Sequence, residues 1–309
     1  MAIVLMLGAG CADSPPIEPS LPPLAARVRD LHVQGQELLD HGDLDRARAV
    51  FDEARQLAES TDDRRGLVVA LNDVGMVLAL KGEAAKAGEL HRRAHGIARA
   101  LDRPDLAAES LSYLGAAVQQ AGQPDQARAL YEEALEMARR IGDRRNEAVL
   151  LNNLGLAQKQ AGDLSKAQAY FQAALALNQE LDNRRAQAAN IANLGLIAEQ
   201  AGRLDEAWGR FFTALQLDKI IEDRSAIAAD LANLARVAER QNRKDVAMEY
   251  AQRAYSSYRA LGNAARALVE LQRAVALSRQ QGREAEALKL EMEASTFKAS
   301  VISTEPAKP

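Results

Sequence analysis

The stretch GDRRNEAVLLNNLGLAQKQAGDLSKAQAYFQAALALNQELDNRR, residues 142–185, decides the fold of this chain. Its first half has helical periodicity, because Leu151 and Gly155 share one helical face before Gly162 interrupts the pattern. A second helical run follows over residues 164–177. The stretch therefore predicts two antiparallel helices joined by a short turn, with the second helix the longer.

The same pattern recurs every forty residues along the chain, which is typical of a repeat architecture. Glycine marks the turn of each unit, with Asn242 filling the one gap: Gly42, Gly82, Gly122, Gly162, Gly202 and Gly282. One alanine column recurs in the same register: Ala47, Ala87, Ala127, Ala167, Ala207, Ala247 and Ala287. A second alanine column follows seven residues later, on the same helical face. These columns predict seven consecutive units.

A second glycine column lies inside the first helix of five units: Gly35, Gly75, Gly115, Gly155 and Gly195. Glycine within a helix costs roughly 0.5–1 kcal/mol relative to alanine, so these positions predict close contact with a neighbouring helix. A bulky column in the second helix is expected to fill the remaining space: Phe51, Tyr131, Phe171 and Phe211. His91, Ala251 and Glu291 depart from that column.

Helix starts are also visible in the sequence. Asp143, Asn183 and Asp223 recur at forty-residue spacing just before the first helix of a unit. Their side chains can accept hydrogen bonds from free backbone N–H groups, so we expect them to act as helix N-caps.

The pattern Leu-x-x-Leu-Gly, then Gly-Asp-Leu, then Ala-x-x-x-Phe-x-x-Ala resembles the tetratricopeptide repeat. Residues 142–185 are similar to its forty-residue variety, known from Pins-type spindle-orientation adaptors and Rap-type peptide-responsive regulators. The resemblance extends over residues 28–298, with a truncated, capping last unit. It implies an all-α, right-handed superhelical solenoid of about seven helix-turn-helix units. It does not identify a partner, because the motif residues are structural.

Composition excludes several classes of protein. The chain is 48% hydrophobic and 27% charged, so it can bury a core, while 4% aromatic residues and nine prolines favour closely packed helices. The net charge of −4, with interspersed signs, argues against a nucleic-acid partner. The single cysteine excludes a disulfide scaffold and any cysteine-rich metal site.

The N-terminal region resembles a bacterial lipoprotein. Residues 1–10 are apolar or small, like the end of a signal peptide, and they stop at Cys11, the expected lipidation site. Residues 11–27 form a proline-rich tether, and residues 299–309 are expected to form a polar tail. Gly8 departs from the lipoprotein pattern, in which leucine is usual, and no Lys or Arg precedes the apolar run. The alternative is that Cys11 is a free thiol in a cytoplasmic protein.

Polar columns on the first helices are the candidate peptide-binding groove. The family resemblance implies that these helices line the concave face. The candidate residues are Asn72, Asn152, Asn153, Asn193, Asn233, Gln120, Gln160 and Gln200. Asparagine and glutamine each present a donor and an acceptor, which suits the backbone of an extended peptide, and we expect these side chains to be exposed. Alternatively they simply solvate a helix face.

An arginine column lies at the loop before each first helix, including Arg144, Arg184 and Arg224. These side chains could contact acidic groups on a ligand. The favoured interpretation is instead that they pair with aspartates such as Asp143 and Asp223 and tie neighbouring units together.

No constellation of catalytic residues is recognisable, so we expect a protein that is not an enzyme and uses no cofactor. His91 and His95 are spaced i, i+4, but no third metal ligand is evident. We expect a protein or extended peptide as partner, with no small-molecule substrate. The expected function is that of a lipid-anchored scaffold in envelope assembly, on the periplasmic face of the outer membrane in a Gram-negative cell. The alternative is a cytoplasmic peptide-responsive regulator.

Overall fold

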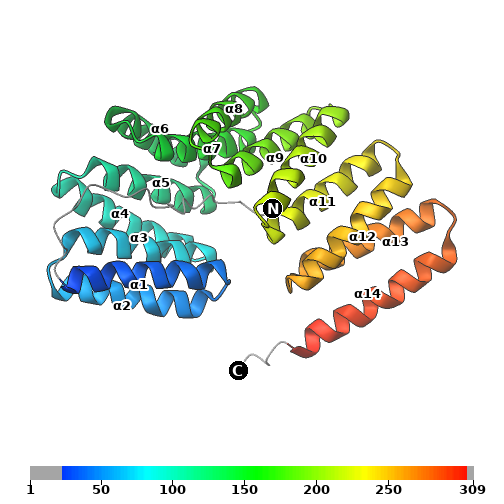
Figure 1. Cartoon of the computed structure of the whole chain (residues 1–309), viewed down its shortest axis with the longest axis horizontal. Coiled ribbons are helices and arrows are strands. Elements are labelled where there is room, and N and C mark those ends of the chain that lie inside the picture. Colours follow the sequence, from blue (N-terminus) through cyan, green and yellow to red (C-terminus); the bar gives the residue numbers. More distant parts are fainter. Residues whose placement is uncertain (1–22, 305–309) are drawn as a thin grey trace. The chain divides into compact units, whose positions relative to one another are not determined.

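The computed structural model describes residues 23–304, and this part of the chain consists of fourteen helices joined by short turns (Figure 1). The helices are α1 (Pro23–Asp40), α2 (Leu44–Ser60), α3 (Arg64–Leu80), α4 (Ala84–Ala100), α5 (Pro104–Gln120), α6 (Pro124–Ile141), α7 (Arg144–Gln160), α8 (Leu164–Glu180), α9 (Arg184–Gln200), α10 (Leu204–Ile220), α11 (Arg224–Arg240), α12 (Lys244–Ala260), α13 (Ala264–Gln280) and α14 (Glu284–Thr304). The predicted all-α repeat solenoid is confirmed.

The two helices of a repeat are nearly equal in length, so the expectation of a longer second helix is wrong. For example, α9 and α10 each have 17 residues. The first helices begin before the first apolar position of each unit, because the helix starts directly after its N-cap residue. Asp143, Asn183 and Asp223 are N-caps, as predicted, and each accepts a hydrogen bond from a backbone N–H three residues further on.

The turn inside each repeat requires a left-handed residue. Gly162, in the middle of the turn between α7 and α8, has a φ of +84°, which glycine adopts without steric cost. Asn242, which fills the gap in the glycine column, adopts the same region with φ +59°. Asparagine tolerates this conformation better than most residues, so the exception obeys the same physical rule.

The glycine column inside the first helices is a contact column, as predicted. A Cβ atom on Gly155 would lie 2.6 Å from Cε1 of Phe171, and one on Gly115 would lie 2.6 Å from Cε1 of Tyr131. His91 fills the aromatic position of its own repeat, since a Cβ on Gly75 would lie 2.5 Å from its Cε1.

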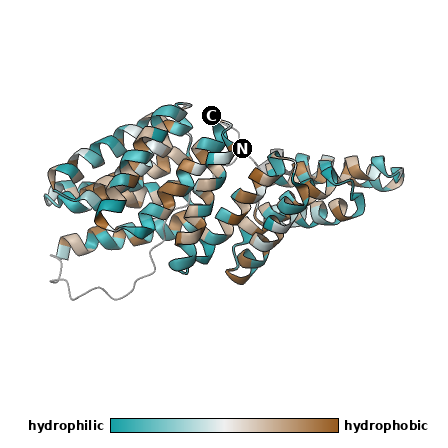
Figure 2. Ribbon diagram, turned by 90° about the horizontal axis from the view of Figure 1, so that it is seen from above, coloured by the Kyte–Doolittle hydropathy of each residue, from teal (hydrophilic) through white to brown (hydrophobic). Residues whose placement is uncertain are grey.

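The sixth repeat changes both members of this contact together. It has Ala235 where other repeats have glycine and Ala251 where others have an aromatic ring, and both alanines are fully buried. A smaller side chain on one helix therefore makes room for a larger one on the other. Apolar and hydrophilic residues are interspersed along the helices (Figure 2). The second helix α2 buries one face, whereas the first helix α3 is buried at every position from Ala70 to Ala79.

The chain divides into two compact units, Met1–Leu177 and Asn178–Pro309, with the boundary inside α8. In unit 1 the first helices of consecutive repeats contact one another, from α1 through α3 and α5 to α7. Within the described part of this unit, α2, α4 and α6 make no comparable contacts with each other. The first helices therefore form the more closely spaced layer, which we call the inner layer of unit 1.

The ends of the array differ from the predicted boundaries. Helix α1 starts at Pro23, inside the predicted tether, since proline suits the first turn of a helix. Helix α14 continues to Thr304, into the predicted tail. Cys11 and residues 1–22 lie outside the described residues. Among residues 23–304, no helix is both long and apolar enough to cross a membrane.

Candidate binding surfaces on the first helices

An acidic cluster lies in the inner layer of unit 1. His32 Nδ1 on α1 lies 2.7 Å from Asp73 Oδ2 on α3, and Gln36 Nε2 donates to Asp73 Oδ1 at 3.2 Å. The hydrogen bond to Asp73 raises the pKa of His32, while burial raises the pKa of Asp73. The His32–Asp73 contact and burial of the carboxyl group therefore couple the protonation of these two side chains.

Helix α5 adds a second carboxyl group to this cluster. Burial, and then the charge of Asp73, raise the pKa of Glu109 to about 7. Tyr113, one turn further along α5, forms a hydrogen bond with Glu109. No Lys or Arg in the described part of unit 1 forms an ion pair with Asp73 or Glu109. His32 is therefore the one cationic partner of these two carboxyl groups.

A buried polar network lies behind the acidic cluster. Asn72 Nδ2 donates to Ser110 Oγ at 2.9 Å, and Asn72 Oδ1 lies 3.1 Å from His91 Nδ1. The His91 ring also stacks on Tyr113, with centroids 5.3 Å apart, and burial lowers the pKa of His91 to about 3. Asn72 is 4% exposed and bonded on both sides, so the expectation that it faces the groove is wrong.

Two more residues of the predicted asparagine columns are buried. Asn152 and Asn153 are 1% and 5% exposed, whereas Asn193 and Asn233 are half-buried. The expectation of exposure is therefore wrong for Asn152 and Asn153. In unit 2, Asn233 Oδ1 accepts from Arg236 Nη2 at 2.9 Å, so its side chain supports an internal contact.

The glutamine column, which the sequence placed in the groove, ties consecutive first helices together. Gln120 Nε2 donates to the backbone oxygen of Ala79 at 2.9 Å, and Gln160 Oε1 accepts from Gln119 Nε2 at 3.0 Å. Arg240 occupies the same column and donates to the backbone oxygen of Glu199 at 2.8 Å. Gln120 and Arg240 thus add a hydrogen bond to a carbonyl group at the end of the preceding first helix, which also accepts from the backbone N–H of the turn glycine, Gly82 or Gly202. Gln200 is exposed.

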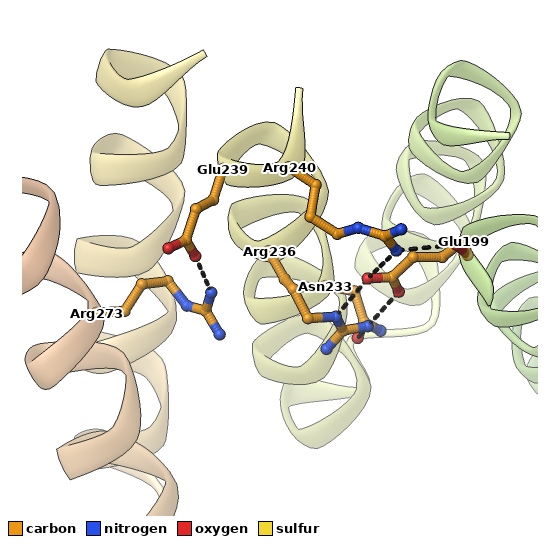
Figure 3. A network of polar contacts seen from close by, with 6 residues as sticks. All are labelled: Glu199, Asn233, Arg236, Glu239, Arg240 and Arg273. Atoms are coloured by element: carbon orange, nitrogen blue, oxygen red, sulfur yellow. Dashed lines mark hydrogen bonds and ion pairs between the residues drawn. The ribbon is translucent and has the colours of Figure 1, made fainter. Parts of the chain in front are cut away.

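Unit 2 carries a charged network on α9, α11 and α13 (Figure 3). Arg236 binds the carboxylate of Glu199 through two hydrogen bonds, of 2.8 and 2.7 Å, and Arg240 lies 3.3 Å from the same carboxylate. Burial opposes ionisation of Glu199, but hydrogen bonds from both arginines outweigh it and lower its pKa. Arg273 donates one hydrogen bond to Glu239 and another, from Nε at 3.0 Å, to Glu270, so that three arginines face three glutamates. This network balances its own charges, unlike the acidic cluster of unit 1.

The arginine column at the loops forms ion pairs within the protein. Arg144 lies 3.6 Å from Glu147, and Arg184 lies 3.6 Å from Asp182. Arg185 reaches Asp223 of the next repeat at 3.6 Å, which is the tie between neighbouring units that the sequence favoured.

The remaining arginine of that predicted set, Arg224, is exposed. His91 and His95 point to different partners, Asn72 and the backbone oxygen of Ala107. Residues 23–304 contain no group of three or more His, Cys, Asp or Glu side chains that could hold a metal ion.

Residues 106–180 match the tetratricopeptide repeat family. Among solved structures, BtubC from P. vanneervenii is similar, with a TM-score of 0.59 and 23% identity over 78% of this chain and 93% of that one. A Rap protein in complex with Competence and Sporulation Factor has a TM-score of 0.66 and 16% identity over 90% and 76% of the two chains.

A third similar structure is the Rap conjugation gene regulator of the plasmid pLS20 with the Phr* peptide. Its TM-score is 0.60, with 18% identity over 86% of this chain and 77% of that one. At this level of identity the likeness establishes a shared repeat fold. No curated protein sequence matches the chain.

Glu109 is the residue that sequence reasoning missed. It lies one turn before Tyr113, where the column has valine or alanine in the neighbouring units, as at Val69 and Val149. The available signal was a carboxyl group in a column that is valine or alanine in every other unit except the first, which has Arg29. The acidic cluster can accept hydrogen bonds and attract positive charge, whereas it contains no nucleophile held against a base.

Proposed function

We propose that this protein is a peptide-binding or protein-binding scaffold, and that the inner layer of unit 1 holds a basic segment of its partner. The observation that carries the proposal is the charge imbalance at Asp73 and Glu109. A Lys or Arg side chain of a ligand would supply the missing countercharge at a partly desolvated site, where charge-assisted hydrogen bonds are strong.

Two further observations support this proposal. Tyr113 is half-buried beside Glu109, so it offers a ring face and a polar tip to a ligand. The similar Rap structures were solved with a factor or a peptide bound, so this fold accommodates such ligands.

The test is a titration of the full chain with a lysine-rich peptide and with a glutamate-rich peptide of equal length. We expect the lysine-rich peptide to bind more tightly, and Asp73→Asn combined with Glu109→Gln to weaken it by about tenfold or more. Glu89→Gln is the matched control, since Glu89 is an exposed carboxylate on α4. Equal binding of both peptides, or an equal loss with the control, contradicts the proposal.

The same site predicts a pH dependence of binding. Because burial raises the pKa of Glu109 to about 7, this carboxyl group is largely protonated at acidic pH and ionised at alkaline pH. His32, whose pKa the hydrogen bond to Asp73 raises, carries a positive charge that competes with the ligand until the pH is high enough to remove it. The affinity for the lysine-rich peptide should therefore rise from about pH 6 to about pH 8. An affinity that falls over this range would exclude Glu109 as a ligand contact.

We further propose that lipid on Cys11 anchors the scaffold in the bacterial cell envelope, where it serves envelope assembly. Support comes from the sequence alone, since the small residues before Cys11 resemble a lipoprotein signal. Metabolic palmitate labelling of the protein, expressed with its upstream region, should mark the wild type but not Cys11→Ser. The variant should move to the soluble fraction, because paired acyl chains provide stable anchoring.

The alternative is a cytoplasmic peptide-responsive regulator, which the likeness to the Rap structures favours. A wild-type protein that takes up no palmitate label and stays in the soluble fraction would favour this alternative. A pull-down with the full chain, from membranes and from cytosol, would then identify the natural partner in either case.

A further inference from the structure

The outward face of α10 in unit 2 differs from that of the other second helices. Its solvent-facing stripe contains Gly209, Phe212, Thr213, Gln216 and Ile220. Phe212 is 43% exposed and Ile220 is 62% exposed. The stripe is thus uncharged and partly apolar over three turns. The corresponding positions of α6 carry several charges: Glu132, Glu133, Glu136 and Arg140.

Gly209 has no explanation within the chain. It lies in the interior of α10, where glycine is unfavourable, and a Cβ placed on it would have no neighbouring atom within 4 Å. The other glycine near this helix, Gly195 on α9, is explained by Phe211, which lies 2.9 Å from its Cβ position. Gly209 therefore faces open space on the surface, one turn from the exposed ring of Phe212.

A wall of aromatic and cationic side chains borders the stripe. Trp208 packs edge-on against Tyr250 of α12 with centroids 5.4 Å apart, and Arg243 lies 4.5 Å above the Trp208 ring. Arg253 lies 5.0 Å from the Tyr250 centroid. Tryptophan, tyrosine and arginine are the residues enriched at energetically important positions of protein interfaces. These side chains hold one another in place, and none of them fills the open space at Gly209.

We propose that this face is an interface between two copies of the chain, with α10 packing against α10 of the second copy in antiparallel orientation. Asp205 lies at the N-terminal end of the stripe and Lys219 at its C-terminal end. A two-fold axis through the stripe places the acidic end of each copy opposite the basic end of the other. Phe212 of each copy then packs beside Gly209 and Thr213 of the other copy, whose side chains are small, and Ile220 lies over the N-terminal end of the opposite stripe.

This self-complementarity distinguishes a second copy from an unrelated helix. One helix crossing buries less surface than a standard interface, so the dimer is expected to dissociate at micromolar concentrations. The proposal is independent of the peptide site, which lies in unit 1.

The test is sedimentation of the full chain from about 1 to about 300 µM, a range that brackets micromolar dissociation. Cys11→Ser is used as the background, so that neither a disulfide nor a lipid at this residue contributes. We expect the average mass to rise with concentration toward that of two chains. Phe212→Gln and Gly209→Leu should each weaken association by at least about tenfold.

Two control variants leave the stripe intact. Met292→Gln changes an exposed apolar residue at the position of α14 that corresponds to Phe212, and Gly96→Leu fills open space on α4. Neither should alter the dissociation constant, and helical circular dichroism should show that all variants are folded. A chain that stays monomeric throughout, or a dimer that Phe212→Gln and Gly209→Leu leave unchanged, overturns the proposal.

Discussion

Gly155 and Phe171 illustrate how one absent Cβ atom positions two helices. The ring of Phe171 lies where a side chain on residue 155 would begin, which permits α7 and α8 to approach closely. The cost of placing glycine in a helix is thereby offset by the packing of a fully buried aromatic ring.

Gly155→Ala should therefore lower the free energy of unfolding by about 1–3 kcal/mol, because the added methyl overpacks the contact with Phe171. Chemical denaturation monitored by circular dichroism would measure the change. Gly96→Ala on α4 is the control, since the same methyl meets open space there and should stabilise by roughly 0.5–1 kcal/mol. Equal effects at both sites would show that helix propensity, and not packing, governs the glycine column.

A second residue-scale feature is the pair of buried carboxyl groups Asp218 and Asp230, which hydrogen-bond to each other at 4% and 2% exposure. The preceding repeat has an amide pair at the same positions, Asn178 and Asn190, joined at 2.9 Å. Burial raises the pKa of both aspartates. The negative charge of Asp223 adds to this shift, while Arg185 opposes it at Asp218 and Asn233 at Asp230.

A raised pKa means that the folded state holds protons which the unfolded state releases, so stability falls as pH rises above the ordinary carboxyl range. Converting Asp218 and Asp230 together to asparagine should remove this loss. The double variant should exceed the wild type in unfolding free energy by about 2 kcal/mol at about pH 8, and by much less at about pH 4. Thermal melts at both pH values are the measurement, and a pH-independent difference would show that the pKa values of Asp218 and Asp230 are not raised in the folded state.

At the scale of elements, the helix starts are set by short polar side chains at the turns. Asp63 accepts a hydrogen bond from the backbone N–H of Gly66 at 2.9 Å and thereby caps α3. Glu83 occupies the N-cap position of α4, but its side chain makes no capping hydrogen bond. The longer glutamate side chain does not fold back onto the first turn, which explains the difference.

Asp63→Ala should therefore lower the free energy of unfolding by about 1 kcal/mol, with loss of the cap as the cause. Glu83→Ala should have a smaller effect, because the exposed pair it forms with Lys86 contributes little. Urea denaturation of the two variants side by side decides between these outcomes, and a larger loss at Glu83 would contradict the capping argument.

At the scale of the whole molecule, each helix contacts mainly its neighbours in the chain. Stability in such an array is approximately a sum of repeat and nearest-neighbour terms. The last helix, α14, packs mainly on α13 and contacts α12 only through a few side chains such as Tyr255, whereas α12 packs extensively on both α11 and α13.

Amide hydrogen exchange should therefore be faster in α14 than in α12. Opening α14 breaks mainly its interface with α13, whereas opening α12 breaks its interfaces with both α11 and α13. Mass spectrometry of exchanged peptides from the two helices gives the comparison. Slower exchange in α14 would indicate that something covers the end of the array in solution.

The sequence by itself determined the repeat, its period, the helix caps and the contact between glycine and aromatic columns. These features depend on local geometry: the spacing of apolar residues, the reach of an Asp or Asn side chain, and the room left by a missing Cβ. Each is repeated several times, so a single departure such as His91 did not obscure the column.

Only the tertiary structure decided which polar columns face outward. Asn72 and Asn153 carry the same side chain as the half-buried Asn193, but both are buried, and Asn72 bonds to Ser110 of the next first helix. Likewise Gln120 bonds a carbonyl group of the preceding repeat, and Asp73 meets Glu109 across two helices. Burial and pairing depend on residues about forty positions away, and a periodic sequence does not reveal how closely successive helices approach each other.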